Sequence, residues 1–192
     1  MVPPGAGELT DTVVRMELLT DRLVLRRWRP TDREPFARMN ADPEVMRYLL
    51  QPLAREESDA FIDRIERHFD EHGFGLWAVQ VATSGSFIGY VGLSIPSFEA
   101  HFTPAVEVGW RLDHPYWGNG YATEAARAAI ADGFGRVGLK EIVSFTVPVN
   151  LRSIAVMERL GMSRDPRDDF EHPNVPKSHP YRRHVLFRMA AP

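Results

Sequence analysis

Two glycines stand one residue apart in the segment YWGNGYATEAARAA, residues 116–129, directly before an alanine-rich stretch. Glycine lets the backbone approach an anion without a Cβ in the way, and the first N–H groups of a helix have no partner within that helix. Such N–H groups, at the positive end of the helix dipole, bind phosphate. The spacing therefore predicts a phosphate or pyrophosphate cradle at Gly118 and Gly120, with a helix over about residues 120–136. The alternative is a tight strand-to-helix turn without a ligand.

Three kinds of cradle are possible at this position. A P-loop needs a Gly-Lys pair, which the sequence lacks. A dinucleotide fingerprint needs a third glycine where Thr123 stands, and its acidic partner ends the next strand, whereas Glu141 begins it. The third kind is a cradle for an acyl-coenzyme A.

The strand that leads into this segment, over about residues 105–112, carries a carboxylate. Its alternation places Glu107 and Arg111 on one face, so Glu107 is a candidate proton acceptor. The alternative without a catalytic role is an exposed carboxylate paired with Arg111. Gly109 removes a side chain beside Glu107, which predicts a bulge or a close ligand approach. The opposite face holds four apolar residues, Val106, Val108, Trp110 and Leu112.

The other elements follow from hydrophobic period and from turn residues. Thr31 is expected to cap the first helix, and the Pro- and Asp-rich residues 164–181 form an excursion before the last strand. The order predicts a mixed α+β fold with residues 17–192 as a single domain and residues 1–16 as a flexible tail. Strands are expected over about 22–28, 75–82, 86–95, 141–147 and 182–189, and helices over 30–39, 55–73, 120–136 and 150–161.

Composition narrows the class of protein. The formal net charge of −3 gives no general basic field for nucleic acid, and the absence of cysteine excludes disulfides and a catalytic thiol. No apolar run approaches the ~20 residues of a membrane span, and the first 14 residues do not resemble a signal peptide. These features predict a cytoplasmic protein that binds neither nucleic acid nor membrane.

The ordered motifs resemble the GCN5-related N-acetyltransferase (GNAT) superfamily. Its pyrophosphate motif, [RQ]-x-x-G-x-[GA], is matched by Gly120 and Ala122, with Trp117 where Arg or Gln is usual. The form YWGxGYATEA is similar to the RimJ/RimL-like branch, which acetylates protein N-termini and small amines. Further similar segments, such as VNLRSIAVMERLGM, extend the resemblance over about residues 18–190. It implies a central mixed, mostly antiparallel sheet of about seven strands with helices on both faces.

The resemblance also implies a reaction and its residues. Acetyl-CoA would be the co-substrate, a primary amine of a small molecule or a protein N-terminus the acceptor, and no metal would take part. Glu107 would accept the amine proton through water, and Ser153 would assist the leaving thiolate. The implied cofactor-binding residues are Trp110, Arg111, Leu112, Trp117, Gly118, Asn119, Gly120, Tyr121, Ala122, Thr123, Asn150 and Ser153.

The tyrosine that many members of the superfamily use as the acid is missing from this sequence. Many members of the superfamily use as acid a tyrosine seven residues after the asparagine at Asn150, and that position is Met157, which cannot donate a proton. Ser153 is the substitute, and its alternative role is a helix cap. Asn150 would hydrogen-bond pantetheine amides or, alternatively, cap the same helix. Because this acid is missing, a non-catalytic acyl-CoA-binding or sensor domain remains the rival to an enzyme, in either case as a monomer or a homodimer.

Histidines offer two other patterns. The segment HFDEH, from His68 to His72, matches the H-x-x-E-H arrangement of some zinc proteases, but no later helix supplies a third ligand. His172, His179 and His184 belong to the Pro-rich C-terminal excursion, which suits a wall of the substrate site better than a metal centre. Of these, His172 is the one expected to touch substrate.

Overall fold

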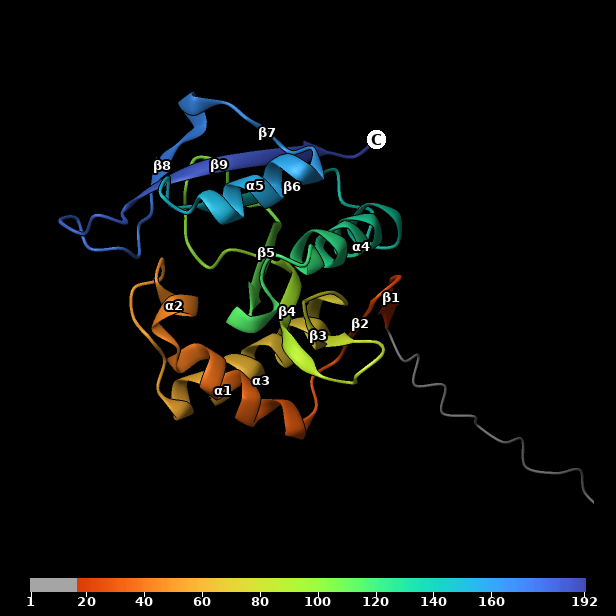
Figure 1. Cartoon of the computed structure of the whole chain (residues 1–192). Helices are drawn as coiled ribbons and strands as arrows, with labels where there is room; N and C mark the ends of the chain where they lie inside the picture. Colours follow the sequence, from red (N-terminus) through yellow and green to blue (C-terminus); the bar gives the residue numbers. More distant parts are fainter. Residues whose placement is uncertain (1–16) are drawn as a thin grey trace, which may run out of the picture.

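The computed structural model describes residues 17–192, so the predicted tail at 1–16 lies outside the described residues. Within that range one sheet of nine strands runs in the order β1-β2-β3-β4-β5-β6-β9-β7, with β8 paired to β9 (Figure 1). All neighbours are antiparallel except β5 and β6, which confirms the predicted mixed, mostly antiparallel sheet. The strands are β1 (Leu18–Leu19), β2 (Leu23–Arg26), β3 (Leu76–Val81), β4 (Phe87–Ser94), β5 (Glu107–Leu112), β6 (Glu141–Thr146), β7 (Ser163–Arg164), β8 (Phe170–Glu171) and β9 (Arg183–Ala190).

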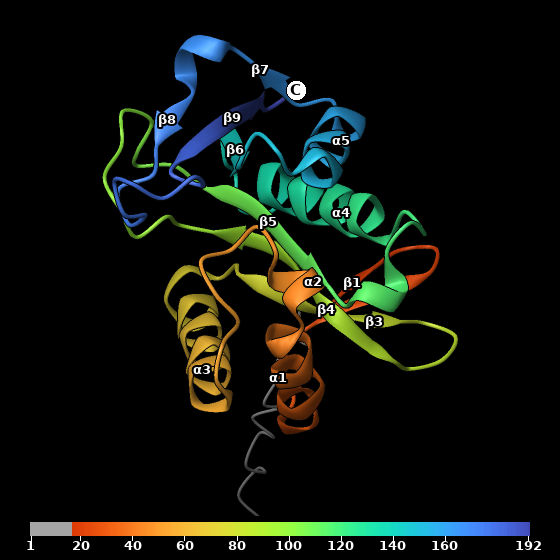
Figure 2. The ribbon, with the colours of Figure 1, turned by 60° about the vertical axis from the view of Figure 1, so that its left-hand side comes forward.

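Helices cover both faces of the sheet, as predicted. Figure 2 shows α1, α2 and α3 on one face, and α4 and α5 on the other. A single large apolar core joins these layers through the sheet. The helices are α1 (Arg33–Ala41), α2 (Pro43–Met46), α3 (Arg55–His72), α4 (Tyr121–Gly135) and α5 (Leu151–Leu160).

Local chemistry explains where the helices begin and end. Gly73 and Gly161 end α3 and α5 in the left-handed conformation, at φ of 72° and 84°, which glycine adopts without steric cost. The predicted Thr31 cap is wrong, because residues 30–32 form a 3₁₀ turn and α1 begins at Arg33. The carboxylate of Asp32 bonds back to the N–H of Arg29 at 2.7 Å and closes that turn.

The sheet opens between β5 and β6. These strands pair only at Glu107 and Val143, where the N–H of Val143 donates to the carbonyl of Val106 at 2.9 Å. One step further, the buried Ser144 hydroxyl donates to the carbonyl of Val108 at 2.9 Å. No strand pairing within residues 17–192 joins β5 and β6 past this point, so the edge of β5 toward Leu112 is left free for another partner.

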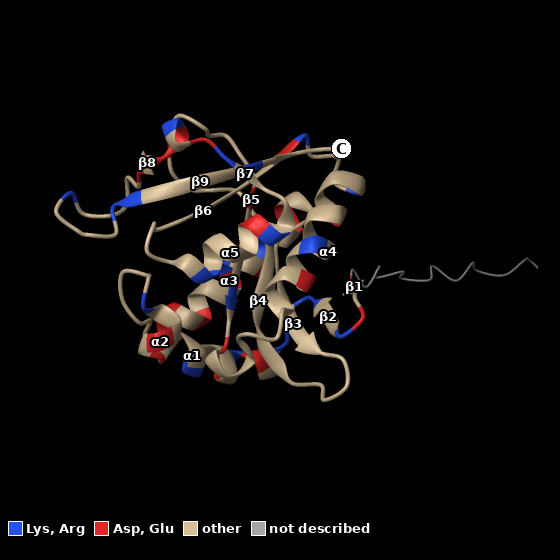
Figure 3. Ribbon diagram, turned by 45° about the horizontal axis from the view of Figure 1, so that its top comes forward, with Lys and Arg blue, Asp and Glu red and all other residues tan. Residues whose placement is uncertain are grey.

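Gly109, where the sequence predicted a bulge or a close ligand approach, lies in regular register opposite Gly92. The bulge is therefore absent at this position. Acidic and basic residues are interspersed over the described ribbon in Figure 3, in keeping with the small net charge. Among residues 17–192, the helices are too short or too polar to cross a bilayer.

Candidate active site

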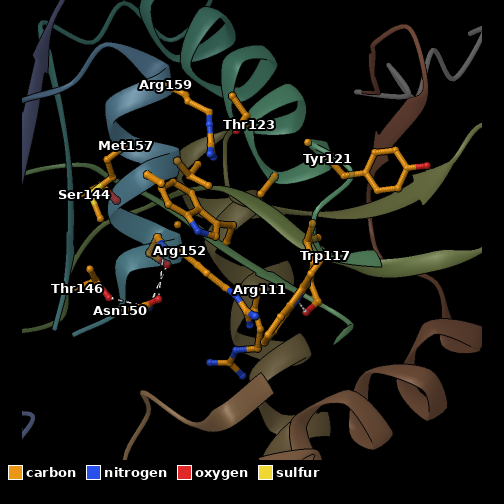
Figure 4. Close-up of a pocket in the computed structure, with 18 of the residues that line it drawn as sticks. Arg111, Trp117, Tyr121, Thr123, Ser144, Thr146, Asn150, Arg152, Met157 and Arg159 are labelled. Carbon is orange, nitrogen blue, oxygen red and sulfur yellow. Dashed lines mark hydrogen bonds between the residues drawn. The ribbon is translucent and has the colours of Figure 1, made fainter. Parts of the chain in front are cut away.

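A cavity of about 1750 Å³ lies where β5 and β6 part, and it is bounded by α2, α4, α5 and the segment around β8 (Figure 4). Figure 4 shows Arg152, Met157 and Arg159 of α5 across from the loop of Trp117 and the start of α4. The residues proposed from the sequence are thus brought together, because every one of them lines this cavity: Glu107, Trp110, Arg111, Leu112, Trp117, Gly118, Asn119, Gly120, Tyr121, Ala122, Thr123, Asn150 and Ser153.

The glycine loop leaves backbone donors unpaired. Gly118 and Gly120 adopt φ of 78° and 80°, and a Cβ on Gly118 would meet no atom within 4 Å, so backbone conformation rather than lack of space requires glycine there. Gly120 caps α4 without a side-chain hydrogen bond, and the first helical bond runs from Glu124 N–H to Gly120 O. The N–H groups of residues 121–123, which form the start of α4, therefore have no acceptor within the helix.

Glu124 fixes this loop against the start of the sheet. Its carboxylate accepts hydrogen bonds from the Thr20 hydroxyl at 2.6 Å and from the Arg22 backbone at 2.9 Å. Burial alone would raise the pKa of Glu124, but the hydrogen bonds from Thr20 and Arg22 lower it overall. The Arg22 guanidinium also lies 4.7 Å from the centre of the Tyr121 ring. These contacts tie the first turn of α4 to the turn between β1 and β2.

Glu107 reaches the cavity as a lone carboxyl group. A Cβ on Gly109 would lie 3.7 Å from Glu107 Oε1, so the carboxyl group extends over the bare backbone of Gly109. Within residues 17–192 it has no hydrogen-bond or ion-pair partner, and burial raises its pKa to about 8. The alternative pairing with Arg111 is wrong, because Arg111 donates to Asn40 Oδ1 at 2.7 Å and lies over the rings of Phe61 and Tyr90.

The two faces of β5 divide the cavity. Glu107 and Arg111 share a face with the paired residues of β4 and β6, and this face is covered by α1, α2 and the segment around β8. Cavity residues on that side include Tyr48, Phe145 and His172. The opposite face, which carries Trp110, packs toward α4 and α5. The glycine loop and Glu107 therefore serve different ends of one cavity.

Asn150 and Ser153 form a short polar network at the start of α5. Asn150 is the N-cap, since its Oδ1 accepts from the N–H of Ser153 at 3.3 Å. Its Nδ2 donates to the hydroxyls of Thr146 and Ser153, each at 3.0 Å. Ser153 is therefore not the cap that sequence reasoning offered as its alternative role; it is the third residue of the helix. Its own O–H proton has no acceptor within the described part of the chain.

Five arginines that line this cavity were missed from the sequence: Arg22, Arg47, Arg127, Arg152 and Arg159. Arg22 and Arg47 pair with Glu124 and Glu44, whereas no carboxylate of residues 17–192 forms an ion pair with the other three. The Arg152 guanidinium lies 4.7 Å from the centre of the Trp117 ring, and Arg127 donates to the carbonyl of Arg159 at 2.9 Å. The seven-residue spacing of Arg152 and Arg159, two helical turns, could have indicated a shared face. Together they make a positive wall across from the glycine loop.

His68 of the HFDEH segment has a structural role. Its Nδ1 bonds to the carbonyl of Phe74 at 2.8 Å, and its Nε2 accepts from the N–H of Ile95 at 3.2 Å. Both ring nitrogens are therefore used by the protein. Among residues 17–192 no cluster of three or more His, Cys, Asp or Glu side chains could hold a metal ion.

The sheet opens at a parallel pair, with a glycine loop and the start of a helix beside the opening. Residues 22–163 match the family model described as the acetyltransferase (GNAT) domain. The chain is 30% identical to the Bacillus subtilis (strain 168) protein YkkB over 149 residues, which is 77% of this chain and 86% of that one. The chain therefore belongs to the GNAT family and is an acetyltransferase of that kind.

Solved structures agree with this assignment. An acetyltransferase from Agrobacterium tumefaciens str. C58 matches with a TM-score of 0.73 and 26% identity, over 96% of this chain and 99% of that one. The RimL ribosomal L7/L12 α-N-protein acetyltransferase, solved in complex with coenzyme A, matches with a TM-score of 0.73 and 15% identity, over 91% of this chain and 98% of that one. The second likeness is one of fold alone.

Proposed function

We propose that this protein transfers an acetyl group from acetyl-CoA to a primary amine by direct attack in a ternary complex. The observation that carries this proposal is the Glu107 carboxyl group, which has no protein partner within residues 17–192 and extends over Gly109 at the point where β5 and β6 part. A group that costs stability and serves no structural contact is expected where chemistry needs it. The amine itself is a small molecule or a protein N-terminus.

The cavity fits acetyl-CoA, which would supply the thioester to be attacked. Backbone N–H groups at the start of α4 would hold the pyrophosphate, and the unpaired arginines Arg127, Arg152 and Arg159 would neutralise phosphate charge. On β5, alternation turns the N–H and C=O of Trp110 toward the open edge, as for Val108, whose carbonyl faces β6. These groups would hydrogen-bond the amides of pantetheine.

The chemistry needs a neutral amine. An α-amino group has a pKa near 8 and a lysine amine a pKa near 10.4, so most acceptors arrive protonated at neutral pH. A carboxylate with a pKa of about 8 is matched to an α-amino group, because the two pKa values are nearly equal. The neutral nitrogen would bond to the acetyl carbon, Glu107 would take the proton that this nitrogen then loses, and the carbon–sulfur bond would break with release of the CoA thiolate. Ser153, oriented by Asn150, would hydrogen-bond the departing thiolate.

The test is the Glu107→Gln variant with a weakly basic acceptor. An amine with a pKa below about 6 stays neutral above that pH, so any remaining pH dependence belongs to the protein. We expect wild-type kcat/KM to rise with pH up to about 8, as Glu107 loses its proton. Glu107→Gln should lower kcat/KM by about 10²–10⁴-fold and remove that rise. Thiol release measured with a chromogenic disulfide reports both quantities.

Calorimetry with CoA supplies the control. Glu107→Gln should bind CoA like the wild type, because the proposed cofactor contacts are backbone groups of Trp110 and the start of α4 and the three unpaired arginines, not the Glu107 carboxyl group. If the pH profile is the same in both proteins, Glu107 is not the proton acceptor. If the wild type binds CoA but releases no thiol with any amine, the rival function is supported, namely a non-catalytic acyl-CoA-binding domain.

A further inference from the structure

The hydroxyl of Ser144 closes the gap between β5 and β6 at its narrow end. The two strands pair at Glu107 and Val143, and one step further a side chain bridges them, because the Ser144 hydroxyl donates to the carbonyl of Val108 at 2.9 Å. Ser144 is only 3% exposed, yet it lines the cavity. The gap therefore begins at a side-chain hydrogen bond, which a substitution can remove without changing the backbone.

Ser144 belongs to the face of the sheet that α5 covers. Successive side chains of a strand point to opposite faces. Val143 packs with Phe170 in the smaller core, whereas Ile142 belongs to the main core together with Met157 of α5. Ser144 is two residues from Ile142 and shares its face. Figure 4 draws Ser144 and the fully buried Met157 among the side chains that line the pocket.

The proposed cofactor contacts set the direction in which the arm of CoA enters the gap. The glycine loop follows the Leu112 end of β5, and the strands pair at the Glu107 end. Between these ends, residues 109–112 supply about 13 Å of free strand edge, along which pantetheine would lie. The sulfur and its acyl group therefore come last, where the gap narrows to the bond between Ser144 and Val108.

We propose that Ser144 limits the length of the acyl group and makes the site selective for acetyl over longer acyl groups. An acetyl group ends one carbon beyond its carbonyl, whereas each further methylene would extend toward the hydrogen bond between Ser144 and Val108. Breaking that bond would leave a buried hydroxyl and a buried carbonyl without a partner, which is unfavourable. This inference rests on the proposed transfer from acetyl-CoA and names the residue that selects the donor.

The experiment compares acyl donors of increasing length. Acetyl-, propionyl- and butyryl-CoA are tested by thiol release, with one primary amine that acetyl-CoA has shown to be an acceptor. Ser144→Ala removes the hydroxyl, whereas Ser144→Thr retains it and adds a methyl group. Ser58→Ala is the matched control, because Ser58 is also fully buried and accepts from Asn40 at 2.8 Å, but it does not line the cavity.

The ratio of kcat/KM for acetyl-CoA to kcat/KM for propionyl-CoA reports the limit on acyl length. Wild type and Ser58→Ala should favour acetyl-CoA by about ten- to a hundredfold, the range for one methylene group in a closed pocket. Ser144→Ala should lower this ratio by about three- to tenfold, the weight of one hydrogen bond. Ser144→Thr should leave it at or above the wild-type value. Ser153→Ala should lower kcat for both donors alike and leave their ratio unchanged.

Binding measured without an amine separates this inference from the transfer reaction. In calorimetry, wild type should bind propionyl-CoA more weakly than acetyl-CoA, and Ser144→Ala should reduce that difference. A wild type that uses both donors equally, or a Ser144→Ala variant with the wild-type ratio, overturns the acyl limit and leaves the proposed function intact. If wild type transfers no acyl group to any amine, the proposed function fails, and the calorimetric difference alone then decides whether Ser144 limits the acyl group.

Discussion

Arginines on the two sides of the sheet differ in whether a carboxylate pairs with them. On the α1–α3 side, Arg26 forms a two-pronged ion pair with Asp32, with N–O distances of 2.7 and 2.9 Å, and both side chains are less than 5% exposed, at 4% and 3%. Its Nε donates to Gln80 at 2.9 Å. In the cavity, by contrast, Arg152 and Arg159 have no carboxylate partner within residues 17–192. The first kind is saturated by the protein, and the second has no ion-pair partner in the described part of the chain.

The same contrast separates the carboxylates. Asp32 receives hydrogen bonds from Arg26 and from the Arg29 backbone, and Glu124 receives them from Thr20 and Arg22. Glu107 receives none from residues 17–192. The cavity thus holds arginines without a carboxylate partner and a carboxyl group without a hydrogen-bond donor, and the two kinds do not pair with each other. The proposed function assigns the arginines to the cofactor and Glu107 to the amine.

The largest effect that would test this contrast is on stability. Asp32→Ala leaves the guanidinium of Arg26 buried and unpaired, and we expect a loss of about 3–5 kcal/mol in the free energy of unfolding. Urea denaturation measures it. The double variant Arg26→Met with Asp32→Leu removes both charges and should recover much of the loss. A single variant as stable as the wild type would show that the pair is not saturated as described.

Local patterns were enough to predict much of the fold. The alternation along β5, the glycines that end α3 and α5, and the loop before α4 depend on residues next to each other in the chain. The ion pair of Asp32 was not predicted, because its partner, Arg26, is buried by distant helices. The predicted cap at Thr31 was wrong for the same reason, since the buried carboxylate closes a 3₁₀ turn instead.

The site was predicted only in part. Glu107 could be placed on a face by alternation, but its raised pKa depends on segments that cover it from elsewhere in the chain. Likewise, His184 meets His172 only because β8 pairs with β9, and no local pattern predicts the pairing of the two-residue strand β8. Arg159 was missed because the orientation of α5 at the cavity is set by packing of this helix, with the fully buried Met157, on elements that are distant in the chain.

The contrast between saturated and unpaired groups also applies to two serine hydroxyls, and Ser153 allows a test at the leaving CoA thiolate. Ser153 accepts from Asn150 at 3.0 Å and keeps its own proton free for a ligand, whereas Ser144 donates its proton to Val108. Ser153→Ala should lower kcat by about tenfold to a hundredfold, the lower range of general acid effects. KM for acetyl-CoA should change little. Ser153→Thr retains the hydroxyl and should recover activity, and equal losses in both variants would limit Ser153 to packing.

The smallest expected effect concerns the unpaired arginines themselves. Arg159→Gln and Arg152→Gln should each weaken CoA binding by about tenfold, the effect of one charge-assisted hydrogen bond, and calorimetry measures it directly. Arg67→Gln is the matched control, because Arg67 on α3 also lacks a carboxylate partner within residues 17–192 but lies outside the cavity and bonds only to the backbone of Asp63. It should leave CoA affinity unchanged.

Salt distinguishes charge from shape in this last comparison. Added salt screens exposed charges over about 8 Å at physiological ionic strength, so it should weaken CoA binding to the wild type and to Arg67→Gln in parallel. The two cavity variants bind CoA more weakly at low salt, and added salt should lower their CoA affinity less, because part of the electrostatic attraction has already been removed. If all four proteins respond to salt alike, the arginines of α5 do not meet phosphate. An unpaired arginine would then be no indicator of a ligand in this fold.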